Sequence, residues 1–322
     1  MKKAQNILIA GFGDIGERVA RKLGASRHYR VKALVRNAGA MPANAKFALS
    51  LGVQLLRGDL SKPRSLQKLT GLADTILHFA PPPGFGETDT HTRNLLAALS
   101  NNRFRGHRGQ NAAPFPRPGM LPRRIVYIST TGVYGDRGGE WVDETSPVKP
   151  ESARARRRVD AERCLRKWGR IHAVAITVLR SPGIYAHDRL PFDRLRRQTP
   201  VLMQSDDVYT NHIHAEDLAG AVILALRQPR PKRWRVFNVV DDSQLLMGDY
   251  FDQVANALGL TRPPRISRTE AERSITPVTF SFMRESRRIH NMRVKRELRL
   301  VLRYPTLANV LSGMSLPAEF EA

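Results

Sequence analysis

Residues 6–16, NILIAGFGDIG, decide the fold of this chain. Residues 6–10 are an almost unbroken apolar run, which is typical of a parallel strand buried on both faces. After the last glycine, apolar residues recur at helical spacing as far as Leu23. The stretch therefore predicts a buried strand, a glycine-rich turn and a helix, in that order.

The three glycines of this turn suit a diphosphate ligand. Gly11 permits the tight turn, Gly13 lets a phosphate approach the backbone, and Gly16 lets the helix pack on the strand. The first N–H groups of the helix and the positive end of its dipole attract the anion. Three glycines can also form a plain turn, but the order of strand, motif and helix favours dinucleotide binding. We expect the cofactor to contact Gly11, Gly13, Asp14, Ile15 and Gly16.

The composition is that of a chain that can bury a large core. Its 322 residues, of which 41% are hydrophobic, suit one large α/β domain or two unequal ones. No apolar run approaches the roughly 20 residues that cross a bilayer, and the N-terminus leads into the first strand without room for a signal peptide. The single cysteine, Cys164, excludes an internal disulfide and a Cys-rich metal site. We expect a cytoplasmic protein without a bound metal.

The formal net charge of +24 attracts anions such as nucleotides, phosphorylated substrates or nucleic acid. The arginines are spread along the whole chain, however, and no basic stripe interleaved with aromatic residues marks a nucleic-acid surface. Near the C-terminus, Arg287, Arg288 and Arg293 would suit a phosphate, although a solvated helix face explains most of these charges. We expect a small anionic substrate as partner, and neither a nucleic acid nor a membrane.

Two further apolar runs end beside residues that can recognise the adenosine half of the cofactor. Residues 31–35 end at Arg36, where an arginine can pair with a 2′-phosphate, whereas an acidic residue would hydrogen-bond a 2′-hydroxyl. Arg36 therefore favours NADP over NAD, unless it is an ordinary surface arginine at a strand end. Residues 53–56 form the third run; Asp59, followed by Leu60, can then accept a hydrogen bond from the adenine amino group.

A fourth apolar run, residues 74–80, leads into a proline-rich segment. Ligands of open α/β sheets bind at the carboxyl ends of the strands, so we expect Phe79, Ala80 and Pro81 to form a wall beside the cofactor. Residues 101–122, rich in Gly, Pro, Asn and Arg, then interrupt the alternation of strands and helices. We interpret them as a surface insertion; the alternative is a basic arm that contacts an anionic partner.

Further motifs follow in a characteristic order, namely STTGVYG at 129–135, RSPGIY at 180–185, NHIHAEDLA at 211–219 and VFNVVDD at 236–242. This set resembles the extended short-chain dehydrogenase/reductase superfamily, the group of the NAD-dependent epimerases and dehydratases of nucleotide sugars. With ESRR at 285–288 and Asn291, the chain looks like the YeeZ-type members, which are usually classed among the atypical branches. The resemblance implies an α/β fold with a doubly wound, parallel Rossmann sheet of about seven strands and a smaller C-terminal substrate-binding lobe. It also implies that Pro182 lies beside the cofactor.

From this resemblance we expect residues 1–182 to form the NAD(P)-binding domain and residues 183–322 to form the lobe. The insertion at 101–122 interrupts the first domain, and the chain is expected to return to that domain at 211–240. The helices at 88–99 and 152–168 form the dimer face in many relatives, which makes a homodimer an option, although arginine-rich surfaces oppose self-pairing.

The resemblance also implies roles in the chemistry. In the superfamily a Ser or Thr orients the substrate, a Tyr exchanges the proton, and a Lys four residues later assists the Tyr and holds the nicotinamide ribose. Thr130 matches the first role, but Arg154 and Arg158 occupy the positions of the Tyr and the Lys. A guanidinium stays protonated at neutral pH and cannot act as the acid/base group. Arg158 can still hold ribose hydroxyls or a phosphate, and Arg154 can clamp an anionic substrate.

The sequence leaves the proton donor open. The remaining candidates are Tyr134, Tyr185, His187, Tyr209, His212 and His214, whereas Cys164 is interpreted as an inert packed thiol.

The sequence is therefore compatible with two functions. The first is an NADP-preferring oxidoreductase or epimerase with a nonstandard proton donor. The second is a nucleotide-binding protein without redox turnover, similar to the NmrA-like sensors, in which cofactor occupancy controls association with a partner.

Overall fold

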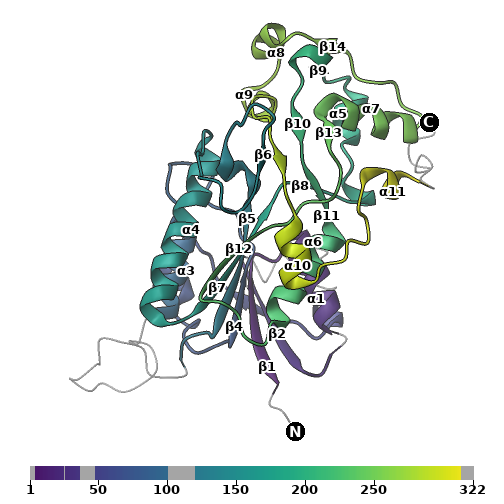
Figure 1. The fold of residues 1–322 in the computed structure, drawn as a ribbon. Coiled ribbons are helices and arrows are strands. Elements are labelled where there is room, and N and C mark those ends of the chain that lie inside the picture. Colours follow the sequence, from purple (N-terminus) through teal and green to yellow (C-terminus); the bar gives the residue numbers. More distant parts are fainter. Residues whose placement is uncertain (1–3, 25, 37–47, 101–119, 313–322) are drawn as a thin grey trace, which may run out of the picture. The chain divides into compact units, whose positions relative to one another are not determined.

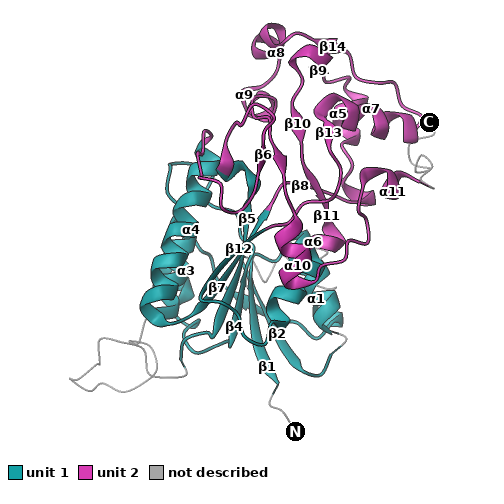
Figure 2. Ribbon diagram, in the orientation of Figure 1, with its two compact units in different colours: residues 1–133, 153–180, 219–237 teal, residues 134–152, 181–218, 238–322 magenta. Residues whose placement is uncertain are grey.

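The computed structural model describes residues 4–24, 26–36, 48–100 and 120–312, and the chain divides into two compact units (Figure 2). Unit 1 comprises residues 1–133, 153–180 and 219–237, and unit 2 comprises residues 134–152, 181–218 and 238–322. The insertion predicted at 101–122 lies almost entirely outside the described residues.

Unit 1 is built on one central sheet. Its strands are β1 (Gln5–Ala10), β2 (Tyr29–Val35), β3 (Gln54–Arg57), β4 (Thr75–His78), β5 (Arg124–Thr130), β7 (Ala175–Ser181) and β12 (Trp234–Asn238). They lie in the order β12-β7-β5-β4-β1-β2-β3, and β1 pairs in parallel with both β2 and β4. The doubly wound, seven-stranded parallel sheet expected from the sequence is confirmed.

Helices cover both faces of this sheet. Figure 1 shows α3 (Thr90–Ser100) and α4 (Ala153–His172) on one face, and α1 (Asp14–Gly24) and α6 (Ala215–Arg227) on the other. Because the sheet is covered on both sides, the second half of β1 is apolar, and its Ile7, Leu8 and Ile9 are completely buried.

Unit 2 consists of short elements. Its strands are β6 (Trp141–Val142), β8 (Gly183–Tyr185), β9 (Val201–Leu202), β10 (Tyr209–Thr210), β11 (His212–His214), β13 (Leu245–Leu246), β14 (Arg265–Ile266) and β15 (Arg288–Ile289). They form four two-stranded sheets, which pair β6 with β15, β8 with β11, β9 with β14 and β10 with β13. The helices of this unit are α5 (Phe192–Arg196), α7 (Met247–Ala257), α8 (Arg268–Ser274), α9 (Pro277–Phe280), α10 (Met292–Leu298) and α11 (Leu307–Leu311). Buried side chains of α7, among them Phe251 and Val254, contribute to its apolar core.

Each unit is made of several segments of the chain, and not of one continuous range on each side of residue 182. Residues 134–152 group with unit 2, because β6 within this segment pairs with β15 near the C-terminus. Of the segment expected to return at 211–240, residues 219–237 group with unit 1, where β12 becomes an edge strand of the central sheet.

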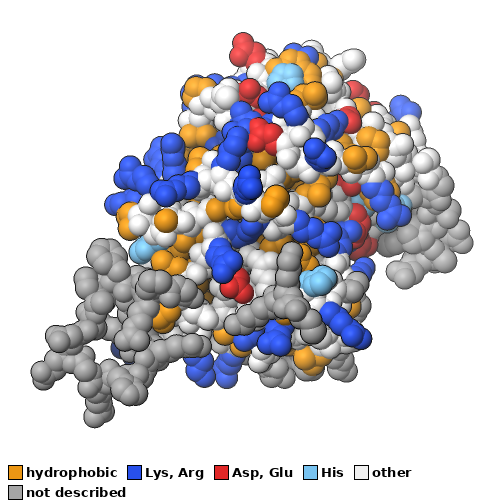
Figure 3. Space-filling model, turned by 60° about the horizontal axis from the view of Figure 1, so that its bottom comes forward, with side chains coloured by type: hydrophobic (Ala, Val, Ile, Leu, Met, Phe, Trp, Pro, Cys, Tyr) orange, Lys and Arg blue, Asp and Glu red, His pale blue; other side chains and the backbone are white. Residues whose placement is uncertain are grey.

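Charged side chains are distributed widely over the surface. Figure 3 shows Lys and Arg side chains spread over the face drawn, between apolar and acidic side chains. None of the helices in the described residues combines the length and the apolar character that a membrane span requires.

Candidate functional site

The carboxyl ends of the unit 1 strands form the candidate nucleotide site. From β1 the chain proceeds to β2 and β3 on one side, whereas β4, the other neighbour of β1, leads to β5, β7 and β12 on the opposite side. This reversal is the topological switch point at which doubly wound sheets bind their ligands. Ala10 at the end of β1 is in register with His78 at the end of β4. The glycine turn and the segment after β4 therefore leave the sheet side by side.

The glycines of the turn differ in what surrounds them. Gly11 has a φ of +100°, and a Cβ there would lie 2.3 Å from the backbone nitrogen of Ala80. A Cβ on Gly16 would lie 2.9 Å from the carbonyl oxygen of Gly11, whereas a Cβ on Gly13 would meet no atom within 4 Å. Gly11 and Gly16 are thus required by packing within the unit. Gly13 faces open space at the start of α1, which is the environment that a diphosphate needs.

The first turn of α1 also contains Asp14 and Ile15. The Nε atom of Arg18, one turn further along the helix, donates a hydrogen bond to Oδ1 of Asp14 at 2.7 Å. The positive charge of Arg18 thus offsets the negative charge of this carboxylate. Ile15 and Gly16 are buried. The face of α1 that contains Ile15 and Gly16 packs on the sheet, so these two residues could bind an anion only through their backbone N–H groups.

Arg36 and Asp59 follow β2 and β3, which are neighbours in the sheet. Arg36 is exposed. Hydrogen bonds from Ser61 hold the pKa of the Asp59 carboxyl below its usual value, and the positive charge of Arg36 adds a smaller contribution. Leu60, in contrast, is buried, and its carbonyl oxygen accepts a hydrogen bond from Nδ2 of Asn94 at 2.7 Å. The structure therefore brings Arg36 and Asp59 within electrostatic range of each other.

The segment after β4 lies against the glycine turn. The N–H groups of Phe79 and Ala80 both donate to the carbonyl oxygen of Ala10, at 2.8 and 2.9 Å. Pro81 is exposed, and its carbonyl oxygen bonds Nδ1 of His91 at 2.9 Å. This segment is thereby held at both ends beside the start of α1.

Thr130 and Arg158 both lie at the carboxyl end of β5. Thr130 is the last residue of the strand, and its Oγ1 accepts a hydrogen bond from the N–H of Gly132 at 3.2 Å. Arg158 is on α4, and its Nη1 donates to the Tyr127 hydroxyl at 3.0 Å and to the Ile128 carbonyl at 2.8 Å. Arg154 lies one turn earlier on α4 and is exposed. Both hydrogen-bond partners of Arg158 thus lie on β5 within three residues of Thr130.

A buried polar network behind Arg158 was not found from the sequence. The Thr92 hydroxyl donates to Asp89 at 2.8 Å and therefore accepts from Nε2 of His78, also at 2.8 Å. The His78 ring lies 5.0 Å from that of Tyr127. Burial lowers the pKa of His78 to about 4 and raises the pKa of Tyr127 to about 12, so both are neutral at pH 7. The sequence signal for this network is His78, a histidine at the end of β4 with apolar residues on both sides of it in the sequence.

A second buried cluster joins α4 to the two strands beside it. Glu162 accepts from Nη2 and Nε of Arg180 at 2.7 and 3.1 Å, and from the Ser129 hydroxyl at 2.6 Å. Glu162 is 5% exposed and Arg180 is 6% exposed. The carboxylate of Glu162 is therefore fully occupied inside unit 1.

Unit 2 contains all the residues considered as proton donors, namely Tyr134, Tyr185, His187, Tyr209, His212 and His214. Pro182 also belongs to this unit. The hydroxyls of Tyr134 and Tyr185 donate to Asn238 and Asp241 at 2.8 and 3.0 Å, and both tyrosines are buried. Burial lowers the pKa of His212 to about 3. His214 is also buried, whereas Tyr209 is half-buried and His187 is exposed. In unit 1, burial raises the pKa of the Cys164 thiol, which disfavours a reactive thiolate.

Within the described residues, no group of three or more His, Cys, Asp or Glu side chains is arranged to hold a metal ion. Unit 1 instead places a glycine turn and the start of a helix at the switch point of its sheet, as nucleotide-binding α/β proteins do.

The model of the NAD dependent epimerase/dehydratase family matches residues 7–239, and the chain belongs to this family. Protein YeeZ of Escherichia coli K12 is 29% identical over 140 residues, which are 44% of this chain and 48% of YeeZ. The aligned stretch thus spans about half the length of this curated relative. The resemblance inferred from the motifs is confirmed, and family membership supports a nicotinamide cofactor.

Solved structures share the fold over nearly the whole chain. A functionally unknown conserved protein from Silicibacter pomeroyi is 27% identical with a TM-score of 0.73, and the match covers 96% of this chain and 97% of that one. UDP-glucuronic acid 4-epimerase from Bacillus cereus, in complex with UDP-glucuronic acid and NAD, is 19% identical with a TM-score of 0.72. That match covers 95% of this chain and 96% of the epimerase.

Proposed function

We propose that the chain binds NADP(H) at the glycine turn of unit 1 and uses it in an oxidoreductase or epimerase reaction on a small substrate. The open space at Gly13 beside the first N–H groups of α1 is the observation that supports this most directly. Arg36 and Asp59 would hold the adenosine end, and Leu60 would border it through its backbone. Phe79, Ala80 and Pro81 would form the wall beside the cofactor, with Pro182 after β7. Bound NADP(H) supplies a hydride donor or acceptor.

Three side chains would act on the substrate and on the nicotinamide end. The Thr130 hydroxyl orients the reacting oxygen of the substrate. Arg158 donates to ribose hydroxyls or a phosphate with the N–H groups that Tyr127 and Ile128 leave available. Arg154, exposed on α4, clamps an anionic group of the substrate. The UDP-glucuronic acid in the Bacillus cereus structure supports a small anionic substrate. A cytoplasmic location and a homodimer through α3 and α4 complete this proposal.

Arg36 is expected to make NADPH bind at least about 10-fold more tightly than NADH, because a charged hydrogen bond to the 2′-phosphate contributes about 1.5–3 kcal/mol. The substitution Arg36→Asp should remove this preference or reverse it. Arg30→Asp is the matched control, since Arg30 is also exposed on β2 but lies near the amino end of that strand. Calorimetry with both cofactors measures the ratio. Tighter binding of NADH to the unaltered chain would contradict the role given to Arg36.

A cofactor sensor without redox turnover is the second candidate function. It is favoured by Arg154 and Arg158, which stand where the family has its proton-transferring Tyr and its Lys, and by the bonds that hold Arg158 to Tyr127 and Ile128. The double substitution Arg154→Tyr/Arg158→Lys restores the residue types that the family uses for proton transfer. If the chain is a sensor, this variant should reduce carbonyl substrates with NADPH and the unaltered chain should not. Turnover by the unaltered chain in the same assay would exclude the sensor.

A further inference from the structure

Basic side chains form a stripe along the outer face of α4. Every exposed residue of this helix between 163 and 170 is an arginine or a lysine, namely Arg163, Arg166, Lys167 and Arg170. These positions are three or four residues apart, so their side chains follow one another on one face of the helix. Leu165 and Trp168, which lie between them in the sequence, are buried. The stripe therefore covers the side of α4 that faces away from the core.

A second basic segment precedes β12. Its exposed residues are basic or proline, namely Arg227, Pro229, Arg230, Lys232 and Arg233. At its start, the guanidinium of Arg124 donates to the carbonyl oxygens of Ala225 and Gln228, at 2.9 and 2.8 Å. At its end, the carbonyl oxygen of Arg233 accepts from the N–H of Ile176 at 2.9 Å. The segment is thus fixed to the central sheet at both ends.

The tertiary structure places the stripe and the segment next to each other. The guanidinium carbon of Arg166 lies 5.8 Å from the centre of the Trp234 ring, which directly follows the segment. Ile176, which bonds Arg233, also packs on α4, because a Cβ on Gly169 would lie 2.5 Å from its Cγ1. The cations of residues 163–170 and 230–233 therefore form one surface of unit 1, which we call the basic face. It borders the amino ends of β7 and β12, whereas the glycine turn follows the carboxyl end of β1.

The positive charge of the basic face is not offset by neighbouring acidic residues. The sequence contains no Asp or Glu from 163 to 187 or from 218 to 240. The two acidic side chains earlier on α4 are already bound, since Asp160 pairs with Arg93 at 2.6 Å and Glu162 pairs with Arg180 at 2.7 Å. The basic face therefore presents a concentrated positive field to an anionic partner.

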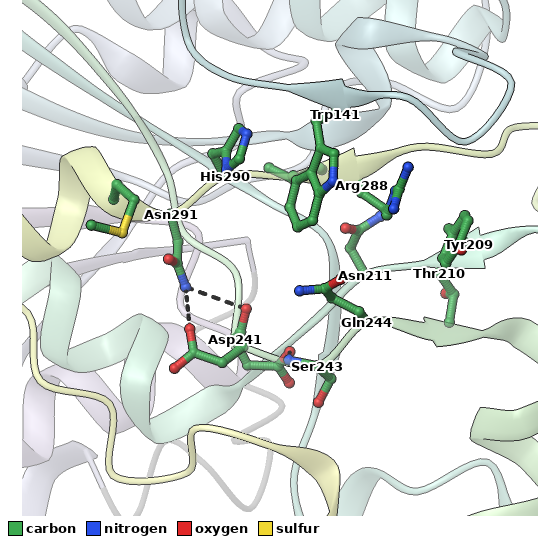
Figure 4. Close-up of a pocket in the computed structure, with 13 residues that line it drawn as sticks. Trp141, Tyr209, Thr210, Asn211, Asp241, Ser243, Gln244, Arg288, His290 and Asn291 are labelled. Atoms are coloured by element: carbon green, nitrogen blue, oxygen red, sulfur yellow. Dashed lines mark hydrogen bonds between the residues drawn. The ribbon is translucent and has the colours of Figure 1, made fainter.

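Two basic side chains of unit 2 differ from the basic face in this respect. They lie at a cavity of about 140 Å³ beside Trp141, lined by residues of β6, β10 and β15 (Figure 4). The guanidinium carbon of Arg288 is 5.1 Å from the centre of the Trp141 ring and 4.9 Å from that of Tyr209. Lys295 pairs with Asp242, which lines the cavity, at 2.5 Å. These two cations are occupied by their neighbours, whereas those of the basic face are exposed to solvent.

The composition of the basic face suits a phosphate backbone. Arginine predominates, and its planar guanidinium matches two phosphate oxygens at once. The exposed side chains at 163–170 and 230–233 are all Arg or Lys. The face thus has none of the Asn, Gln, Asp or Glu side chains that read adenine or cytosine edges. Contacts made to phosphates alone position a nucleic acid but carry no sequence information.

A double helix suits this face better than an acidic peptide or a lipid surface. It carries one negative charge per about 1.7 Å of its axis on a stiff scaffold. Fixed cations can therefore contact it without the ordering cost of a flexible peptide. Binding to a lipid surface is strengthened by apolar side chains that insert beside the cations. Between residues 163 and 173, however, Ile171 is the only large apolar side chain that is exposed.

We propose that the basic face of unit 1 binds the phosphate backbone of double-stranded nucleic acid without reading its sequence. The α4 stripe and the segment before β12 contact phosphates together, and the counterions that they displace make the affinity dependent on salt. This function goes beyond the cofactor-dependent reaction. It also departs from the expectation of evenly spread arginines, because only the fold joins the two segments.

The test is fluorescence anisotropy of the full chain with two labelled DNA duplexes of unrelated sequence, each of about 20 base pairs, in about 50 to 200 mM NaCl. Both duplexes should bind equally. The slope of log K against log salt should be about −5, as for roughly six phosphate contacts. Arg163→Gln/Arg170→Gln should weaken both duplexes by at least about 10-fold and make the slope shallower by about 2. Arg230→Gln/Arg233→Gln should have the same effect.

Arg27→Gln/Arg30→Gln is the matched control, because it removes the same charge from exposed positions of unit 1. Arg30 lies on β2, five positions from β12 in the sheet and so about 24 Å away. This variant should change the affinity by less than about 2-fold. Urea unfolding of all three variants should match that of the unaltered chain, since every replaced side chain is exposed.

Four results would overturn the inference. The first is the absence of DNA binding at the lowest salt concentration. The second is an equal loss of affinity in the control variant, which would show that total charge attracts the DNA. The third is displacement of the DNA by polyglutamate at an equal concentration of charge, which would indicate an acidic protein partner. The fourth is sedimentation with phosphatidylserine vesicles that outcompetes the DNA and is lost in the Arg163→Gln/Arg170→Gln variant, which would indicate a lipid surface.

Discussion

Replacing Gly13 by alanine is expected to weaken NADPH binding by about 5- to 150-fold, through a steric cost of about 1–3 kcal/mol. The free energy of unfolding should stay within about 0.5 kcal/mol of its original value. Both expectations follow from the space around this residue, because an added Cβ meets no atom within 4 Å. The methyl group enters the volume that a diphosphate would occupy and disturbs nothing else. Calorimetry with NADPH and urea unfolding measure the two quantities.

Gly11→Ala is the matched substitution, and we expect it to change the free energy of unfolding, which Gly13→Ala should leave nearly unchanged. Its Cβ would lie 2.3 Å from the backbone nitrogen of Ala80, and the φ of +100° is unfavourable for alanine. We expect Gly11→Ala to lower the free energy of unfolding by roughly 3 kcal/mol or more, from backbone strain and overpacking together. If Gly13→Ala bound NADPH as well as the unaltered chain does, the diphosphate would not lie at this turn.

Arg180→Met is expected to lower the free energy of unfolding by about 3–5 kcal/mol, which is the cost of leaving a buried charge without its partner. The Glu162 carboxylate is 5% exposed, and the Arg180 guanidinium supplies two of its three hydrogen bonds, the third coming from Ser129. Methionine has a similar length but no charge, so the carboxylate would keep only the hydroxyl. Urea unfolding followed by circular dichroism gives the difference.

Arg93→Met is the control for an exposed ion pair. Arg93 binds Asp160 at 2.6 Å, but its side chain is 50% exposed, so its removal should cost less than about 1 kcal/mol. In the double variant Glu162→Gln/Arg180→Met the buried charge is gone, and much of the lost stability should return. A cost for Arg180→Met no greater than that for Arg93→Met would show that the buried pair does not stabilise unit 1.

Much of the fold could be predicted from local patterns. The apolar run at residues 6–10 is β1, and the third run, expected at 53–56, is β3 at 54–57, displaced by one residue. Such runs are informative because a parallel strand covered on both faces is apolar over most of its length. The short strands of unit 2 gave no comparable signal. β6 and β15 have two residues each and exist through pairing with each other.

The residues of the candidate site also divide into those that could be assigned from the sequence and those that could not. Gly11, Gly13 and Gly16 could be assigned because their roles depend on neighbours within a few residues. The partners of Arg158 could not, because Tyr127 and Ile128 are about 30 residues away and lie inside an apolar strand. The C-terminal arginines were considered for phosphate on charge alone. The structure instead pairs Arg287 with Glu285 and places Arg288 between two rings.

The sequence by itself determined the strand–turn–helix start, the parallel sheet and the family, since each depends on residue order and periodicity along a short stretch. Only the tertiary structure decided which charges are buried and paired, as in Glu162 with Arg180, and which segments enclose the cavity beside Trp141. Those features join residues that are far apart in the chain, and their energies depend on distance and burial, which come into existence when the chain has folded.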